Sequence, residues 1–136
     1  MSRREEVLGS QISGYQGVID GLNKKISLYT NAKSFLESSN QIVLNVHNDV
    51  KSAREIFLGG GYVVDGETFA PDKFSSIISN TSKLNEEFGR LIRMTNDRIR
   101  EFNNQVSENQ SRLNQAKAEL SSLKKTSHSS GTHTHR

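Results

Sequence analysis

The sequence predicts an all-α protein: a long antiparallel hairpin of two helices joined by a coiled-coil seam, with a short Gly-rich tip that resembles a β-hairpin. Two long stretches carry apolar residues at alternating intervals of three and four, the pattern of a coiled-coil seam. A glycine-rich segment separates them, and the chain contains one proline. We therefore expect a helical hairpin at 1–125, with helices at 4–57 and 71–124, a tip at 58–70 and a disordered tail at 126–136.

The composition favours thin apolar stripes over a thick core. Hydrophobic residues make up 32% of the 136 residues, against roughly 45–50% in an ordinary globular domain. The net charge is +3 and the two signs alternate along the helices, which is typical of a solvated helix surface and disfavours a nucleic-acid partner. The absence of cysteine excludes disulfides and Cys-based metal sites.

The sequence also predicts where the protein is found. No apolar run approaches the roughly 20 residues of a membrane span, and the first ten residues lack the apolar segment of a signal peptide. We therefore expect a cytoplasmic protein without a membrane span. Export by a route that needs no signal peptide stays open.

The first predicted helix carries an unbroken seven-residue repeat. Its seam residues are Leu8, Tyr15, Leu22, Tyr29, Leu36, Val43, Val50 and Phe57. At first the second seam residue of each heptad lies four residues later, at Ile12, Ile19 and Ile26. From residue 29 the partners lie three residues later instead, at Ala32, Ser39, Val46 and Ala53. We therefore predict that the buried stripe turns by about 100°, the angle of one residue.

The second predicted helix repeats the pattern. Pro71 and Asp72 suit its first turn, because that position needs no amide hydrogen and favours an acidic side chain. Its seam residues are Phe74, Ile78, Phe88, Ile92, Thr95, Ile99, Phe102, Val106, Asn109, Leu113, Ala116, Leu120 and Leu123. A short connection makes the two helices antiparallel. The expected pairs are Val43 with Phe88, Tyr29 with Phe102, and Leu22 with Val106.

The segment between the helices combines turn and strand signals. Glycines at 59–61 are expected to stop the first helix. Asp65-Gly66 between β-branched and aromatic residues is a strong hairpin signal. A two-stranded ribbon is barely stable alone, so Tyr62 and Phe69 are candidates either for contact with a partner or for capping the helix turn.

Three further features are candidate partner contacts. Apolar residues beside the seams widen the apolar face for another helix pair, namely Leu28, Phe35, Ile42, Ile77, Leu84 and Leu91. Because a two-helix hairpin buries only one seam, small scaffolds of this kind usually gain stability by association.

The other two candidates are less direct. Gly14, Gly17 and Gly21 form a strip of small residues that predicts either close approach of a partner helix or a frayed helix start. Asn109 is a polar residue in the predicted seam. Such a residue either fixes the register and the choice of partner or contacts water near the open end of the hairpin.

No pattern of catalytic residues is present, and we expect a protein without catalytic, cofactor or metal sites. His47 lies within a helix with no nucleophile at fixed spacing and is interpreted as a structural histidine. The tail carries His128, His133 and His135, which is a composition that binds metals loosely. We interpret the tail as a flexible, solubilising segment.

Two long helices around a Gly-rich turn with an aromatic resemble the small helical-hairpin proteins of type VII secretion in Gram-positive bacteria, the Trp-x-Gly or ESAT-like superfamily. Over residues ~4–125 the pattern looks in particular like that of the accessory partners of LXG-type polymorphic toxins. Gly61-Tyr62 stands where that superfamily has its Trp-x-Gly turn, and the chain has no tryptophan. The resemblance implies an adaptor or targeting chaperone that pairs with the helical N-terminal domain of a toxin.

Two alternatives are kept beside this interpretation. A prefoldin-like chaperone, or a structural coiled-coil subunit of a larger assembly, also combines helices with a small β-hairpin. A basic coiled coil that touches nucleic acid or acidic membrane is disfavoured by the balanced charge. In the first two cases the expected partner is a protein, and the chain works as part of a hetero- or homo-oligomer.

Overall fold

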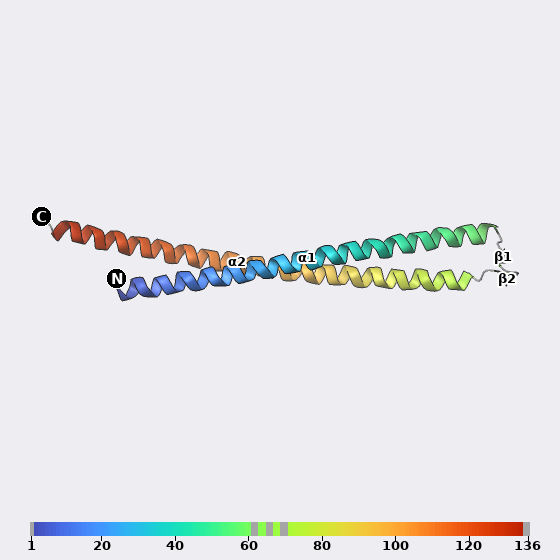
Figure 1. Ribbon diagram of the computed structural model, residues 1–136, viewed down its shortest axis with the longest axis horizontal. Coiled ribbons are helices and arrows are strands. Elements are labelled where there is room, and N and C mark those ends of the chain that lie inside the picture. Colours follow the sequence, from blue (N-terminus) through green and yellow to red (C-terminus); the bar gives the residue numbers. More distant parts are fainter. Residues whose placement is uncertain (1, 61–62, 65–66, 69–70, 135–136) are drawn as a thin grey trace. The chain divides into compact units, whose positions relative to one another are not determined.

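The computed structural model is an all-α helical hairpin, as the sequence predicts. It describes residues 2–60, 63–64, 67–68 and 71–134, and the side chains of 2–59 and 73–126. Helix α1 spans Arg3–Gly60 and helix α2 spans Pro71–Thr134 (Figure 1).

Side-chain chemistry explains where both helices begin. The backbone N–H of Glu5 donates to Oγ of Ser2 at 3.1 Å, so Ser2 caps the first turn of α1 and satisfies one of its free amides. Helix α2 begins at Pro71, as predicted, since the fixed φ of proline suits a first helical position.

Both helices are longer than predicted at their C-terminal ends. Helix α1 continues past 57 through Gly59 to Gly60. Helix α2 continues past 124 to Thr134, so the expectation of a disordered tail from 126 needs correction. Extending an existing helix adds one hydrogen bond for each residue that is ordered, whereas starting one is costly. Weak helix formers therefore lengthen a long helix more readily than composition suggests.

Two short strands lie between the helices. Strand β1, Val63–Val64, pairs antiparallel with strand β2, Glu67–Thr68, in the register Val63 to Thr68 and Val64 to Glu67. The other residues of the predicted tip, Tyr62, Asp65-Gly66 and Phe69 among them, lie outside the described residues. The Gly-rich tip as a whole therefore stays a prediction.

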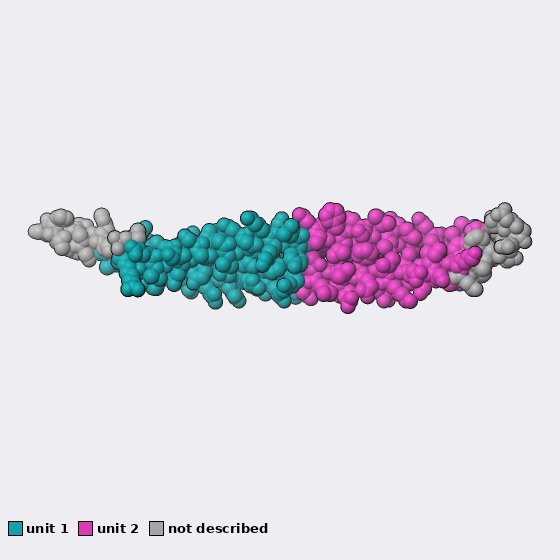
Figure 2. Space-filling view, turned by 60° about the horizontal axis from the view of Figure 1, so that its bottom comes forward, with its two compact units in different colours: residues 1–29, 98–136 teal, residues 30–97 magenta. Residues whose placement is uncertain are grey.

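The chain divides into two compact units, and each contains a segment of both helices (Figure 2). Unit 1 comprises Met1–Tyr29 and Arg98–Arg136, and unit 2 comprises Thr30–Asp97.

Unit 1 has a buried apolar seam. The rings of Tyr29 and Phe102 meet edge to face at 5.3 Å between centroids, which confirms that predicted pair. Near the chain ends, Arg4 binds Glu119 through two hydrogen bonds of 2.9 Å, so the two helix segments run antiparallel. Every buried apolar side chain among the described residues belongs to this unit. They are Leu8, Ile19, Leu22, Phe102, Leu113 and Ala116.

Unit 2 is also an antiparallel helix pair, but its seam differs from the prediction. Nδ1 of His47 lies 2.7 Å from Oγ1 of Thr81, and the rings of Phe57 and Phe74 lie 5.5 Å apart. The predicted turn of the buried stripe at residue 29 is therefore wrong. The half-buried seam residues of α1 continue four residues after each apolar one, at Lys33, Asn40, His47 and Arg54. The predicted partners Ala32, Ser39 and Val46 are exposed, and only Ala53 is half-buried.

A geometric constraint explains the correction. Residues at alternating spacings of four and three stay on one side of a helix, whereas a change of spacing turns the stripe away from the facing helix. Within unit 2 the two helix segments share a single seam, and on α1 this seam includes polar residues. The second apolar stripe of α1 is left outside it.

We predict that Leu113→Ala in unit 1 lowers the free energy of unfolding by about 2–5 kcal/mol, because Leu113 is 1% exposed and its loss leaves a cavity. The matched control is Leu28→Ala in the same unit, since Leu28 is 67% exposed. It should change stability by no more than about 0.5 kcal/mol. Urea denaturation followed by circular dichroism measures both, and equal losses would contradict the seam described for unit 1.

Candidate partner-binding site

A column of polar residues runs through the seam of unit 2. Lys33, Asn40, His47 and Arg54 occupy successive equivalent positions of α1, where Ile12, Ile19 and Ile26 stand in unit 1. Oδ1 of Asn40 and Nε of Arg54 are buried without a hydrogen-bond partner among the described residues. A buried polar atom without a partner costs about 1–3 kcal/mol. The polar column therefore makes the seam of unit 2 weaker than the seam of unit 1.

His47 and Thr81 form the hydrogen bond within this column. The hydroxyl of Thr81 donates to the backbone carbonyl of Ile77 at 2.9 Å or of Ile78 at 3.1 Å. The same hydroxyl oxygen lies 2.7 Å from Nδ1 of His47, and the tautomer of the ring sets which of the two donates. Thr81 is buried, so its hydroxyl is not presented to solvent. The pair satisfies two buried polar groups, in agreement with the structural interpretation of His47.

Many large apolar side chains of unit 2 lie outside its seam and are exposed. Two of those predicted as partner contacts on α1, Phe35 and Ile42, are 76% and 64% exposed. With their neighbours they form a surface that we call the side face. It consists of Phe35, Ile42, Val46 and Ile56 on α1, and Ile77, Leu84, Leu91 and Met94 on α2.

The heptad positions place both halves of the side face on one side of unit 2. Val46 immediately precedes the seam residue His47, and Leu84 follows the seam residue Thr81 by three positions. In antiparallel helix pairs these positions, g in heptad notation, flank the same edge of the seam. Ile77 and Leu91 lie one heptad before and after Leu84, so the apolar row continues along α2. The opposite edge is mostly polar, with Thr30, Glu37 and Lys51 on α1 and Ser75, Ser82 and Asn96 on α2, apart from Leu44 and Leu58.

A solvent-exposed hollow of about 440 Å³ lies on unit 2 beside the side face. It is lined by Asn31, Ser34, Phe35 and Ser38. The three polar side chains are short, so the ring of Phe35 projects from a low surface. An exposed aromatic beside a hollow is a typical anchor point for another protein.

Unit 1 carries charges where unit 2 carries the side face. Position g of α2 holds Leu84 and Leu91 in unit 2 but Arg98, Arg112 and Glu119 in unit 1. Nη1 of Arg98 lies 2.8 Å from the Glu101 carboxylate. Hydrogen bonds to Glu101 and then to the Tyr29 hydroxyl raise the pKa of Arg98 above its ordinary value. The guanidinium also lies 5.4 Å from the centre of the Phe102 ring. The apolar row of α2 therefore ends at Leu91, whereas α1 also exposes Val7, Val18 and Leu28 in unit 1.

The glycine strip is exposed on a continuous helix. Gly14, Gly17 and Gly21 lie within α1, which is helical from Arg3, so the frayed start is not observed. An added Cβ at any of the three meets no atom within 4 Å. No described residue therefore requires glycine there, and a role in contact with a partner stays a prediction.

The remaining predicted contacts are not brought into the side face. Asn109 is half-buried in the seam of unit 1, and its Nδ2 donates to the carbonyl of Gln105 in its own helix at 2.7 Å. This hydrogen bond stays within α2 and does not cross the seam, so it does not support selection of register by Asn109. Tyr62 and Phe69 lie outside the described residues, as do the side chains of His128, His133 and His135.

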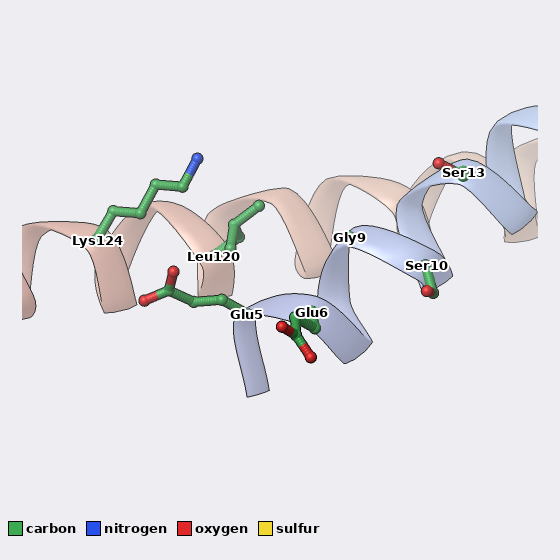
Figure 3. A pocket seen from close by; sticks show the side chains of 7 residues that line it. All are labelled: Glu5, Glu6, Gly9, Ser10, Ser13, Leu120 and Lys124. Carbon is green, nitrogen blue, oxygen red and sulfur yellow. The ribbon is translucent and has the colours of Figure 1, made fainter. Parts of the chain in front are cut away.

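A groove of about 590 Å³ lies in unit 1 between the first turns of α1 and the later part of α2 (Figure 3). Gly9, Ser10 and Ser13 leave it open because their side chains are small, and Leu120 lies at its α2 side. Two acidic residues, Glu5 and Glu6, and one base, Lys124, complete the lining. These groups form no recognisable catalytic arrangement. Throughout the described residues, no group of three or more His, Cys, Asp or Glu is placed to hold a metal ion.

Comparisons with protein-family models, with curated proteins and with solved structures find no match. Within the described residues no helix is both long and apolar enough to cross a membrane.

Sequence reasoning missed part of the arrangement in unit 2. Lys33, Asn40 and Arg54 were not expected in the seam, and Met94 was not expected at its edge. A signal was present, since 33, 40, 47 and 54 continue the seven-residue series that begins at Ile12. Hydrophobicity favoured the neighbouring series at Ala32 and Val46 instead.

We predict that Asn40→Leu stabilises the protein by about 1 kcal/mol, because it removes an unpaired buried oxygen and adds apolar contact in the seam. Asn48→Leu is the matched control, since Asn48 is exposed on the same helix, and it should change stability by no more than about 0.5 kcal/mol. The urea midpoint of each variant provides the measurement. Destabilisation by Asn40→Leu would contradict the seam described for unit 2.

Proposed function

We propose that this protein is a non-enzymatic interaction subunit that pairs with a helical protein partner through the side face of unit 2. The observation that carries the proposal is the division of apolar residues between the units. The buried apolar side chains of the described residues lie in unit 1, whereas nine of the twelve exposed large apolar side chains lie in unit 2, and eight of those nine form the side face. Contiguous apolar surface of this extent marks interaction sites in soluble proteins.

The geometry of the side face supports a helical partner. Phe35, Ile42 and Ile56 project from α1 at multiples of seven residues, with Asp49 interrupting this row between the last two. Ile77, Leu84 and Leu91 form an uninterrupted row of the same period on α2. A partner helix that lies along such rows offers side chains at matching intervals. A globular partner would contact only part of each row.

For the identity of the partner we propose the helical N-terminal domain of an LXG-type toxin, which makes this chain an adaptor or targeting chaperone of type VII secretion. Support comes from the resemblance in helix length, heptad pattern and Gly-rich turn. Export of the chain together with its partner, by a route without a signal peptide, belongs to the same proposal.

We predict that the chain binds the N-terminal domain of an LXG-type toxin encoded beside it, and that Ile42→Glu weakens this binding at least tenfold. A charge on the side face loses its hydration on binding and meets apolar side chains that offer it no hydrogen bond or opposite charge. A tenfold loss of affinity corresponds to about 1.4 kcal/mol of binding free energy. Gln41→Glu is the control, because it adds the same charge one residue away on the polar surface of α1. Isothermal calorimetry with the full chain compares the three proteins.

Two results would count against the proposal. No binding of the toxin domain would remove the adaptor role, and equal binding by both variants would place the contact away from the side face.

A prefoldin-like chaperone is the competing proposal, and the pairing of β1 with β2 between two helices is the observation that favours it. Such a chaperone binds unrelated unfolded chains and suppresses their aggregation. The adaptor proposal predicts no such protection in a light-scattering assay with a thermally unfolded enzyme.

A further inference from the structure

Unit 2 contains two neighbouring rows of residues that fit the period of its seam. In heptad notation the observed seam uses positions a and d, and a position g immediately precedes each position a. The a positions hold Lys33, Asn40, His47 and Arg54 on α1, and Ile78, Asn85 and Ile92 on α2. The g positions hold Ala32, Ser39, Val46 and Ala53 on α1, and Ile77, Leu84 and Leu91 on α2. Two of the seven a residues are apolar, against six of the seven g residues. Hydrophobicity therefore favours the row beside the seam over the row within it.

Opposing interactions act on the two rows. Oδ1 of Asn40 and Nε of Arg54 are buried in the observed seam without a hydrogen-bond partner among the described residues, which is unfavourable. Leu84 at 49% exposure and Leu91 at 41% still have apolar surface to lose. The contact of 2.7 Å between His47 and Thr81 favours the observed row. When such interactions nearly balance, a protein populates both arrangements.

A turn of each helix about its own axis exchanges the two rows without any sliding of the helices. Neighbouring residues lie 100° apart around a helix, so a seam that moves from positions a and d to positions d and g needs half that angle, about 50°. The layers are kept. His47 and Thr81 share one layer, and Val50 with Ile78 forms the next, three residues on along α1 and three back along α2. After the turn, Val50 meets Ile77 in place of Ile78.

The sequence of unit 1 does not permit the same exchange. Its a positions on α1 are already apolar, at Ile12, Ile19 and Ile26. Its g positions include the charged residues Lys25, Arg98, Arg112 and Glu119, and a charge moved into a seam loses its hydration. The turn also has a cost within α1, because two successive spacings of three, from Ile26 to Ala32, overwind a coiled coil locally. This cost keeps the observed arrangement the major one.

We propose that unit 2 exchanges between the observed, open arrangement and a minor, closed arrangement in which both helices have turned by about 50° and the g residues form the seam. The turn buries Val46, Leu84 and Leu91 and moves the polar column to the edge of the seam, where water reaches it. Asp49, at a position c, stays outside both seams. The closed arrangement thus withdraws the inner part of the side face, and a partner that binds this face selects the open one. Only this selection rests on the function proposed above.

Disulfide trapping in the full chain tests the exchange. Val50→Cys is combined with Ile78→Cys, which reports the open arrangement, or with Ile77→Cys, which reports the closed one. Both reporters therefore replace one valine and one isoleucine. Closure of each pair is followed under mild oxidation at low protein concentration, by mass spectrometry after alkylation.

Two adjacent substitutions are expected to shift the exchange in opposite directions. Burial of a leucine changes such an equilibrium by roughly tenfold or more. Ser39→Leu adds its side chain to the closed seam and should speed closure of the 50/77 pair at least fivefold. Asn40→Leu adds its side chain to the open seam and should slow that closure at least fivefold. Ser38→Leu is the matched control, since Ser38 is exposed on the side of α1 away from the seam, and it should leave the closure rates of both pairs unchanged.

An unchanged rate of 50/77 closure in Ser39→Leu would overturn the inference, as would faster closure in Asn40→Leu. Far-ultraviolet circular dichroism checks that each variant keeps its helices, and Ala53→Leu gives the same test at another g position if Ser39→Leu does not fold. Addition of the toxin domain separates the two proposals. A domain that binds and slows 50/77 closure supports selection of the open arrangement, and one that binds without any effect on this rate overturns the selection. Exchange in a chain that does not bind the domain contradicts the proposed adaptor role alone.

Discussion

The contact between α1 and α2 repeats every seven residues, and this period decides which side chains enter the seam and which face solvent. Each helix of a hairpin presents two positions in seven to its neighbour, and they stay on one side only while spacings of three and four alternate. In unit 1 these positions hold Leu8, Ile19 and Leu113, which are buried. In unit 2 the same period brings Lys33, Asn40, His47 and Arg54 into the seam of α1. The apolar residues beside them are left facing outward.

This constraint connects the weak seam of unit 2 with its exposed surface. A chain with limited apolar content either concentrates its apolar side chains in the seam or divides them between the seam and an exposed face. Unit 1 follows the first course, since its seam is apolar and its flank carries ion pairs such as Arg98 with Glu101. Unit 2 follows the second, with Val43 and Phe88 in the seam and Phe35 and Leu84 on the side face. An exposed apolar surface is thus present in unit 2 together with a seam that contains polar residues.

Much of the fold could be predicted from the sequence, because the relevant signals are local. Proline 71 marks the start of a helix, and the seam of α2 from Phe88 to Leu123 is apolar often enough to reveal its own register. The seam of α1 beyond Tyr29 could not be predicted by hydrophobicity, since Val46 is more apolar than His47 yet lies outside it. Long polar side chains enter a seam by burying their stems, and Thr81 satisfies the ring of His47. In the seam of unit 2, heptad position decides the burial of a side chain more than its polarity does.

In unit 2, His47 faces α2 and Val46 does not. The chain has no cysteine, so an introduced cysteine pair forms disulfides without competition from native thiols. His47→Cys with Thr81→Cys is compared with Val46→Cys with Thr81→Cys under mild oxidation, each in the full chain at low concentration. Disulfides require Cβ atoms about 3.5–4.5 Å apart, which favours side chains that meet across the seam. We predict that the 47/81 pair forms an intramolecular disulfide much faster than the 46/81 pair, as measured by mass spectrometry after alkylation. Faster closure by the pair that contains position 46 would contradict it.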